Sequence, residues 1–173
     1  MMEEKAAEIK LLFLDVDGVM TDGRISISDQ GKEIKSFDVK DGQGLKMLMS
    51  GGVEVVLVTG RRSPAVEHRA RDLGIEEVYQ GVADKGALCV KLTKVKGLKK
   101  QEICGMGDDL PDLAMFMKAG LRIAVADAVK EVREAADFIT RSKGGSGAVR
   151  EACEWILKCQ KKWHSVLTAF SGK

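Results

Sequence analysis

Short apolar runs alternate with segments of helical character along this chain, and this alternation limits its fold more than any other feature. The two longest runs, at 9–14 (IKLLFL) and 53–58 (VEVVLV), are nearly continuous in apolar side chains. Shorter candidate strands follow at 78–80, 102–104, 121–125 and 138–139. Strands whose two faces are both covered by helices show such continuous runs. We therefore predict an α/β fold: a doubly wound (Rossmann-like) parallel sheet with helices on both faces.

Capping residues, prolines and glycines mark helix boundaries between these runs. Helices are predicted from Ser63-Pro64 to Gly74, from a cap at Asp41 to 51–52, from a cap at Asp84 to about 97, from 109 to 118 with Pro111 in the first turn, and from about 146 to 161. Each of them connects two predicted strands or follows the last one, as the parallel sheet requires.

Residues 24–38 (RISISDQGKEIKSFD) interrupt this rhythm with two alternating runs around Asp29-Gln30-Gly31. This pattern predicts a small β-hairpin directly after the first strand. Ligands of open α/β sheets bind beyond the carboxyl ends of the strands. We therefore expect the hairpin to stand beside the functional site.

The length of 173 residues fits one domain over 1–173, with the hairpin at about 24–38 and a C-terminal helix and tail at about 146–173. Lys and Arg number 28 against 26 Asp and Glu, a balance that argues against a nucleic-acid partner. Aromatic residues, at 5%, are too few for a base-stacking surface. No apolar run reaches the roughly 18 residues of a membrane span, so no membrane partner is expected.

The compartment is inferred from the N-terminus and the cysteines. Residues 1–10 carry acidic and basic side chains and do not resemble a secretory signal. The cysteines, which form no CxxC pair, are Cys89, Cys104, Cys153 and Cys159. We interpret them as reduced packing residues of a cytoplasmic protein.

Two carboxylates follow the first predicted strand. Alternation places Asp15 and Asp17 on the same side of the chain, and Gly18 allows a tight turn after them. The pair could share a divalent metal or act as nucleophile and general acid. A solvated acidic turn or a helix cap would have the same sequence, so the pair alone does not decide between these functions.

The next strand end and a later helix start add two further candidates. The second strand ends in Thr59-Gly60-Arg61, which could also be a simple turn stabilised by the threonine hydroxyl. Lys85 lies at a predicted helix start, where a cation is unfavourable for the helix dipole. A nearby anion would explain Lys85, although a solvated surface lysine is an equal alternative.

A cluster of acids follows the strand that ends near Cys104. Residues 105–112 read GMGDDLPD, which places Asp108, Asp109 and Asp112 at one strand-to-helix turn. A helix cap needs one acid and not three, so their repulsion indicates a cation nearby. Oxygen ligands without histidine favour Mg²⁺ or Mn²⁺ over zinc.

The order Asp-x-Asp, Thr, Lys, Gly-Asp-Asp-x-x-Asp resembles the haloacid dehalogenase (HAD) superfamily, with all four of its signature motifs between about 11 and 112. The second acid, Asp17, argues for phosphoryl transfer rather than dehalogenation. Four segments are similar to the 3-deoxy-D-manno-octulosonate 8-phosphate (KDO 8-phosphate) phosphatase family: 15–23 (DVDGVMTDG), 39–44 (VKDGQG), 59–61 (TGR) and 144–151 (GGSGAVRE). That similarity runs to about Cys159.

The resemblance implies a phosphomonoesterase that works through a phosphoaspartate. Asp15 would be the nucleophile, and Asp17 would be the general acid and then the general base. Thr59 would bind a phosphoryl oxygen, and Lys85 would neutralise charge around the nucleophile.

The same resemblance implies a magnesium cofactor. The ion would be held by Asp15, the backbone carbonyl of Asp17 and Asp108, with Asp112 in a supporting position.

The substrate implied by the resemblance is a small sugar-acid phosphate. Backbone N–H groups near Gly18 and Gly60 would complete the phosphate cradle, and Arg61 would bind the carboxylate of the sugar acid. KDO 8-phosphate is the first expectation. Phosphatases of N-acylneuraminate or other nonulosonate 9-phosphates use similar recognition groups and remain the alternative.

No cap domain is expected, because the segments between the first three motifs are already filled by predicted elements. An inserted domain below roughly 40 residues would be hard to stabilise. Relatives without a cap form homotetramers, in which the C-terminal segment of a neighbour reaches the site. The resemblance therefore implies a homotetramer, with the tail after Cys159 as the candidate cover.

Two other classes of protein fit the motifs less well. A receiver domain also combines clustered Asp, Thr and Lys on a doubly wound sheet, but its acidic pair precedes the phosphoacceptor strand, whereas here the cluster at 108–112 comes last. A silent binding or scaffold protein would not need all four motifs to be intact.

Overall fold

A parallel sheet of six strands forms the centre of the computed structural model, which describes residues 1–171 of the chain and the side chains of 1–169. The end of the predicted tail, at 172–173, lies outside the described residues. The strand order is β5 (Glu77–Gln80), β4 (Glu54–Thr59), β1 (Leu11–Leu14), β6 (Ile103–Gly107), β7 (Leu121–Ala124) and β8 (Phe138–Ile139). Every neighbouring pair is parallel.

Strand β1 lies at the centre of the sheet, and all four of its side chains are buried. In the register of the sheet, Leu12 is the partner of Val55 on β4 and of Cys104 on β6. The continuous apolar run is explained by this position, because both faces of the strand are covered. The predicted parallel α/β sheet is confirmed.

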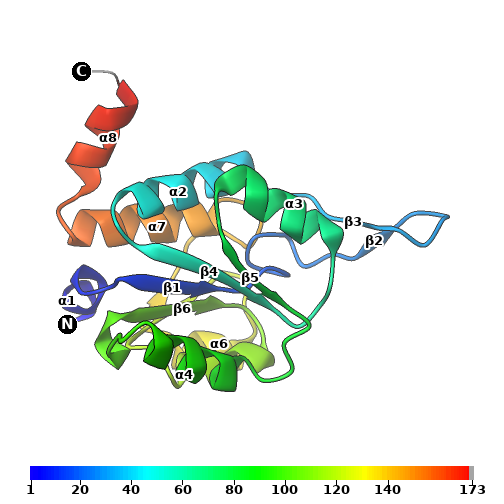
Figure 1. Ribbon diagram of the computed structural model, residues 1–173, viewed down its shortest axis with the longest axis horizontal. Coiled ribbons are helices and arrows are strands. Elements are labelled where there is room, and N and C mark those ends of the chain that lie inside the picture. Colours follow the sequence, from blue (N-terminus) through cyan, green and yellow to red (C-terminus); the bar gives the residue numbers. More distant parts are fainter. Residues whose placement is uncertain (172–173) are drawn as a thin grey trace.

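Helices cover both faces of the sheet (Figure 1). On one face lie α2 (Val39–Ser50), α3 (Pro64–Leu73) and α7 (Ala148–Cys159). On the other lie α4 (Lys85–Val95) and α6 (Lys130–Ala135), with α5 (Leu113–Phe116) packed on α4. The remaining helical segments are α1 (Met2–Ala7), α8 (Trp163–Ser171) and the 3₁₀ turns η1 (Lys100–Glu102) and η2 (Leu110–Asp112).

The predicted hairpin is present, with two short antiparallel strands, β2 (Ser26–Ile27) and β3 (Glu33–Ile34). It projects beyond the carboxyl end of β1 (Figure 1). Between β1 and β4 the chain forms only this hairpin and α2, so no cap domain is inserted there.

The N-cap predictions were partly wrong. Helix α2 is capped by Asp38, whose carboxylate accepts hydrogen bonds from the backbone N–H groups of Lys40 and Asp41. Asp41 instead accepts hydrogen bonds from Gly147 and Arg150 at the start of α7. Ser63 is in the cap position of α3, but its hydroxyl makes no capping hydrogen bond.

Two helix lengths also differ from prediction. The expected helix at 109–118 begins as the 3₁₀ turn η2 and continues as the single turn of α5. The last predicted helix ends at Cys159, and a separate helix, α8, begins at Trp163. Lys161 lies in this break with φ +58°, a left-handed conformation that interrupts a helix.

All four cysteines are free, and three of them are buried. Among residues 1–171, no helix has both the length and the hydropathy needed to cross a bilayer.

Candidate active site

The predicted site residues meet at the carboxyl edge of the sheet, where the chain changes direction. It runs from β1 out to β4 and β5 and then crosses to β6 on the opposite side of β1. In open α/β sheets ligands bind at such a switch point. Asp15 follows β1, Thr59 ends β4, and Asp108 follows β6. All three therefore arrive at one place from separate strands.

Lys85 is the centre of the most buried part of the site. Its ammonium donates to Asp15 at 2.5 Å and to Asp112 at 2.6 Å, and all three side chains are less than 10% exposed. The interpretation of Lys85 as a solvated surface lysine is therefore wrong. The other interpretation, a nearby anion, fits these two carboxylates.

Asp112 organises the acidic turn after β6. One of its oxygens accepts the bond from Lys85, and the other accepts the backbone N–H groups of Asp108 (2.9 Å) and Asp109 (3.2 Å). Carboxylate acceptors for backbone N–H groups fix a loop with little freedom. The Asp108 side chain is thereby held opposite Asp15.

Asp15, Asp108 and Asp112 each offer an oxygen within 4.8 Å of the others. Burial, then the charge of Asp112, raises the pKa of Asp15 to about 7 against the opposing effect of Lys85. Burial, then the charges of Asp15 and Asp112, raises the pKa of Asp108 to about 8. One lysine is too little positive charge for three clustered carboxylates, of which those of Asp15 and Asp112 are buried and that of Asp108 is half-buried. These oxygen donors fit a hard divalent cation such as magnesium.

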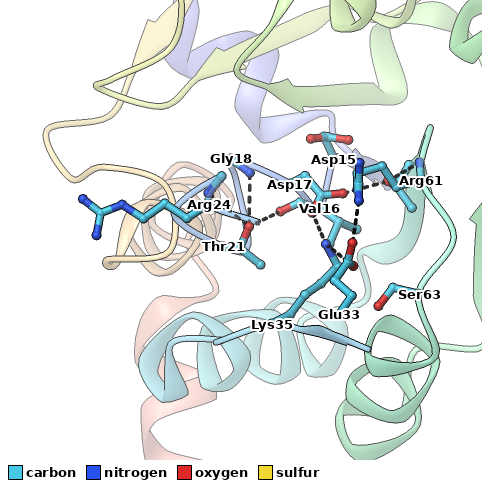
Figure 2. A network of polar contacts seen from close by, with 12 residues as sticks. Asp15, Val16, Asp17, Gly18, Thr21, Arg24, Glu33, Lys35, Arg61 and Ser63 are labelled. Atoms are coloured by element: carbon cyan, nitrogen blue, oxygen red, sulfur yellow. Dashed lines mark hydrogen bonds and ion pairs between the residues drawn. The ribbon is translucent and has the colours of Figure 1, made fainter. Parts of the chain in front are cut away.

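The Asp17 side chain points toward Lys35 of the hairpin and away from the Asp15 carboxylate (Figure 2). One carboxylate oxygen makes an ion pair with Lys35, and the other accepts a hydrogen bond from the Thr59 hydroxyl at 3.2 Å. Thr59 Oγ1 also accepts the backbone N–H of Arg61 at 3.2 Å. The carboxylate of Asp17 is therefore not part of the three-acid cluster, and only its backbone carbonyl remains as the predicted metal ligand.

The predicted glycines have different surroundings. Gly18 has φ +94°, and a Cβ atom there would lie 2.0 Å from Asp108 Oδ2. Its N–H points to Thr21 Oγ1 at 3.3 Å rather than into the cleft. Gly60 lines the cleft.

A cleft of about 440 Å³ opens over these groups. It is lined by Asp15, Asp17, Gly23, Thr59, Gly60, Arg61, Val82, Ala83, Lys85, Asp108, Asp109, Pro111 and Asp112. Every predicted site residue except Gly18 is in this lining. The volume suits a small, polar ligand.

Sequence reasoning did not single out Glu33 and Lys35 of the hairpin. Glu33 contacts Lys35 at 3.0 Å and the Arg61 guanidinium at 2.5 Å. Both partners lower the pKa of Glu33 to about 2. The sequence did contain one signal: Glu33 and Lys35 are two positions apart in a predicted strand, and this spacing places both side chains on one face.

The fold and the site together define a hydrolase of the haloacid dehalogenase type, and residues 74–152 match the family model described as haloacid dehalogenase-like hydrolase. Curated relatives narrow the assignment. The 3-deoxy-D-manno-octulosonate 8-phosphate phosphatase of Yersinia pestis is 43% identical over 159 residues, covering 92% of this chain and 85% of the relative. The enzyme of the same name from Escherichia coli K12 is 42% identical, covering 91% and 84%. This chain belongs to that phosphatase family.

Solved structures agree with this assignment. The 3-deoxy-D-manno-octulosonate 8-phosphate phosphatase of Moraxella catarrhalis, solved with magnesium, phosphate and KDO, has a TM-score of 0.95 and 42% identity over 98% of this chain and 97% of its own. The cobalt-bound phosphatase of Haemophilus influenzae has a TM-score of 0.91 and 40% identity over 97% and 98%.

Proposed function

We propose that this protein is a magnesium-dependent phosphomonoesterase that hydrolyses KDO 8-phosphate to KDO and phosphate. The observation that carries the proposal is the buried arrangement of Asp15, Lys85 and Asp112 beside Asp108, at the carboxyl ends of β1 and β6. Membership of the phosphatase family supports the substrate, and the Moraxella relative was solved with the product KDO, phosphate and magnesium.

The proposed metal ligands are Asp15, Asp108 and the backbone carbonyl of Asp17. Asp112 supports them by fixing the turn at Asp108 and by holding Lys85. A bound magnesium ion would offset the negative charge that Asp15 and the phosphate share as they approach each other.

In the first step, a carboxylate oxygen of Asp15 attacks phosphorus as the bond from phosphorus to the sugar oxygen breaks. Asp17 gives its proton to that sugar oxygen, and KDO leaves. In the second step, Asp17 takes a proton from water, whose oxygen attacks the phosphorus of the phosphoaspartate. Phosphate is released and Asp15 is restored as a carboxylate. Lys85 keeps Asp15 oriented through both steps.

Recognition of the rest of the substrate is assigned to the rim of the cleft. Thr59 and the backbone N–H groups near Gly18 and Gly60 are proposed to bind phosphoryl oxygens, with the Gly18 N–H first leaving Thr21. Arg61 is 46% exposed at the mouth of the cleft, where a guanidinium can bind the sugar-acid carboxylate.

We also propose that the chain is one hydrolase domain that works as a homotetramer in the cytoplasm. Ile25, Ile27 and Ile34 of the hairpin are more than half exposed, which favours burial against neighbouring copies. Four free cysteines suit a reducing compartment. A neighbour's C-terminal segment would then cover the cleft that this chain leaves without a cap.

The test is phosphate release, with magnesium, from KDO 8-phosphate, a nonulosonate 9-phosphate and a hexose 6-phosphate. We expect KDO 8-phosphate to have the highest kcat/KM and Asp15→Asn to abolish turnover of all three. Asp109→Asn, which alters an acid of the same turn, is the matched control and should retain most activity. Preference for the nonulosonate would keep the mechanism and change the substrate. No turnover by folded, magnesium-loaded wild type would refute the phosphatase.

A further inference from the structure

A chain of four alternating charges runs from Asp17, the proposed general acid, to Arg61 at the mouth of the cleft (Figure 2). Asp17 pairs with Lys35, Lys35 with Glu33 at 3.0 Å, and Glu33 with Arg61 at 2.5 Å. The two ends of the chain are the residues proposed to handle the leaving oxygen and the sugar-acid carboxylate. The two middle members come from the hairpin and have no part in the mechanism above.

The hairpin presents these two side chains as a pair. Glu33 begins β3 and Lys35 directly follows it, while Ile34 between them is 57% exposed. The Lys35 side chain is only 3% exposed. A buried ammonium is stable only when it is paired, so Lys35 is fixed in place by Asp17 and Glu33.

The contact with Lys35 matters most when substrate binds. Within the described part of the chain, the other side-chain hydrogen bond to the Asp17 carboxylate comes from the Thr59 hydroxyl. When Thr59 turns to a phosphoryl oxygen, Lys35 remains as the partner that fixes the Asp17 carboxylate. The contact with Glu33 uses a single terminal nitrogen of Arg61, so the other guanidinium donors remain open to a carboxylate.

We propose that Lys35 and Glu33 are positioning residues, Lys35 for Asp17 and Glu33 for Arg61. The hairpin would thus set the acid-base group and the carboxylate-binding group at a fixed separation. This inference rests on the proposed function for the role of Arg61. The role of Lys35 needs only that Asp17 transfers the proton.

The two roles predict different kinetic changes. Lys35→Met should lower kcat roughly tenfold to hundredfold on both KDO 8-phosphate and a hexose 6-phosphate, because misplacing a proton donor by about 1 Å can cost on that order. Lys35→Arg should restore part of kcat. Glu33→Gln should raise KM for KDO 8-phosphate about tenfold, with kcat little changed and the hexose phosphate unaffected.

Matched controls on the hairpin separate these roles from a general loss of structure. Lys32→Met and Asp29→Asn remove the same charges at exposed positions of the hairpin and should leave both substrates unchanged. Thermal melting and light scattering on every variant establish that it is folded and assembled. If folded Lys35→Met keeps kcat within twofold on both esters, the role of Lys35 is refuted.

Equal rises in KM on both esters for Glu33→Gln would refute its role as a partner of the carboxylate site. If the wild type instead prefers a phosphate ester without a carboxylate, the proposed substrate fails. The Lys35 variants are then measured on the preferred ester, where the same loss of kcat supports the role of Lys35 and unchanged kcat refutes it.

Discussion

At the scale of single residues, the Asp108 carboxylate occupies space that is free only because Gly18 has no side chain. Gly18→Ala would place Cβ 2.0 Å from Asp108 Oδ2 at φ +94°. We expect weaker magnesium binding and a loss of activity of at least tenfold, in addition to about 1–3 kcal/mol of backbone strain. Gly31→Ala is the matched control, because φ is +74° but nothing lies within 4 Å. Equal effects of the two variants on magnesium binding would contradict this account.

The raised pKa values in the acidic cluster predict how magnesium and pH act on stability. An unfolded aspartate has a pKa of about 3.9, whereas burial and neighbouring carboxylates raise the pKa of Asp15 to about 7 and that of Asp108 to about 8. Between these limits the folded state holds more protons, so these two groups make the free energy of unfolding fall as pH rises from about 4 to 8. Magnesium should therefore raise Tm more at pH 8 than at pH 5, by roughly 2–4 °C for each kcal/mol of added stabilisation. Calorimetry with EDTA and with magnesium measures this difference, and an equal gain at both pH values would contradict it.

The sequence predicted the residues at strand ends well, because a strand end fixes both position and direction. Asp15 and Asp108 directly follow parallel strands and Thr59 ends one, and the structure brings the three together. Lys35 and Glu33 were missed because their partners come from distant segments, and a pattern of alternation gives a face without identifying what that face meets. The orientation of the Asp17 side chain toward the hairpin could not be predicted either, because its partner Lys35 comes from another segment.

At the scale of elements, Asp41 ties α2 to α7. It is 2% exposed and accepts the N–H groups of Gly147 (3.3 Å) and Arg150 (2.8 Å). We expect Asp41→Ala to lower the free energy of unfolding by about 1–3 kcal/mol, because two partly buried N–H groups lose their acceptor. Asp38→Ala, at the less buried cap of the same helix, should cost about 1 kcal/mol. Urea unfolding compares the two variants. A smaller loss of unfolding free energy for Asp41→Ala than for Asp38→Ala would contradict the proposed link between α2 and α7.

Element boundaries show why local signals were incomplete. The sequence pattern indicated Asp41 as the cap of α2, whereas the structure has Asp38 in that position. The choice is made by α7, more than 100 positions later in the chain, whose N-terminus lies against Asp41. The central strands were predicted more reliably, because strands that are buried on both faces consist almost entirely of apolar residues.

At the scale of the whole molecule, a truncation tests whether helix α8 contributes to the open cleft. Gln160 donates to the backbone oxygens of Ala6 and Ile9, and Lys162 donates to that of Gly51. Both residues therefore attach the segment after α7 to the rest of the same subunit, so a truncation that tests the tail should remove residues from Trp163 onward. Helix α8 contacts α7 and points away from the sheet (Figure 1). We expect the truncated protein to remain folded but to show a higher KM for KDO 8-phosphate.

Mixed oligomers decide whether the tail acts on a neighbouring copy. Truncated subunits supply intact catalytic residues, and full-length Asp15→Asn subunits supply only tails. If a tail covers the cleft of a neighbour, co-expressed hybrids should recover a low KM that neither protein has alone, since each truncated subunit then gains a tail from its partner. A KM in the hybrids equal to that of the truncated protein, with mixed assembly verified by mass spectrometry, would show that the cleft functions without a neighbour's tail.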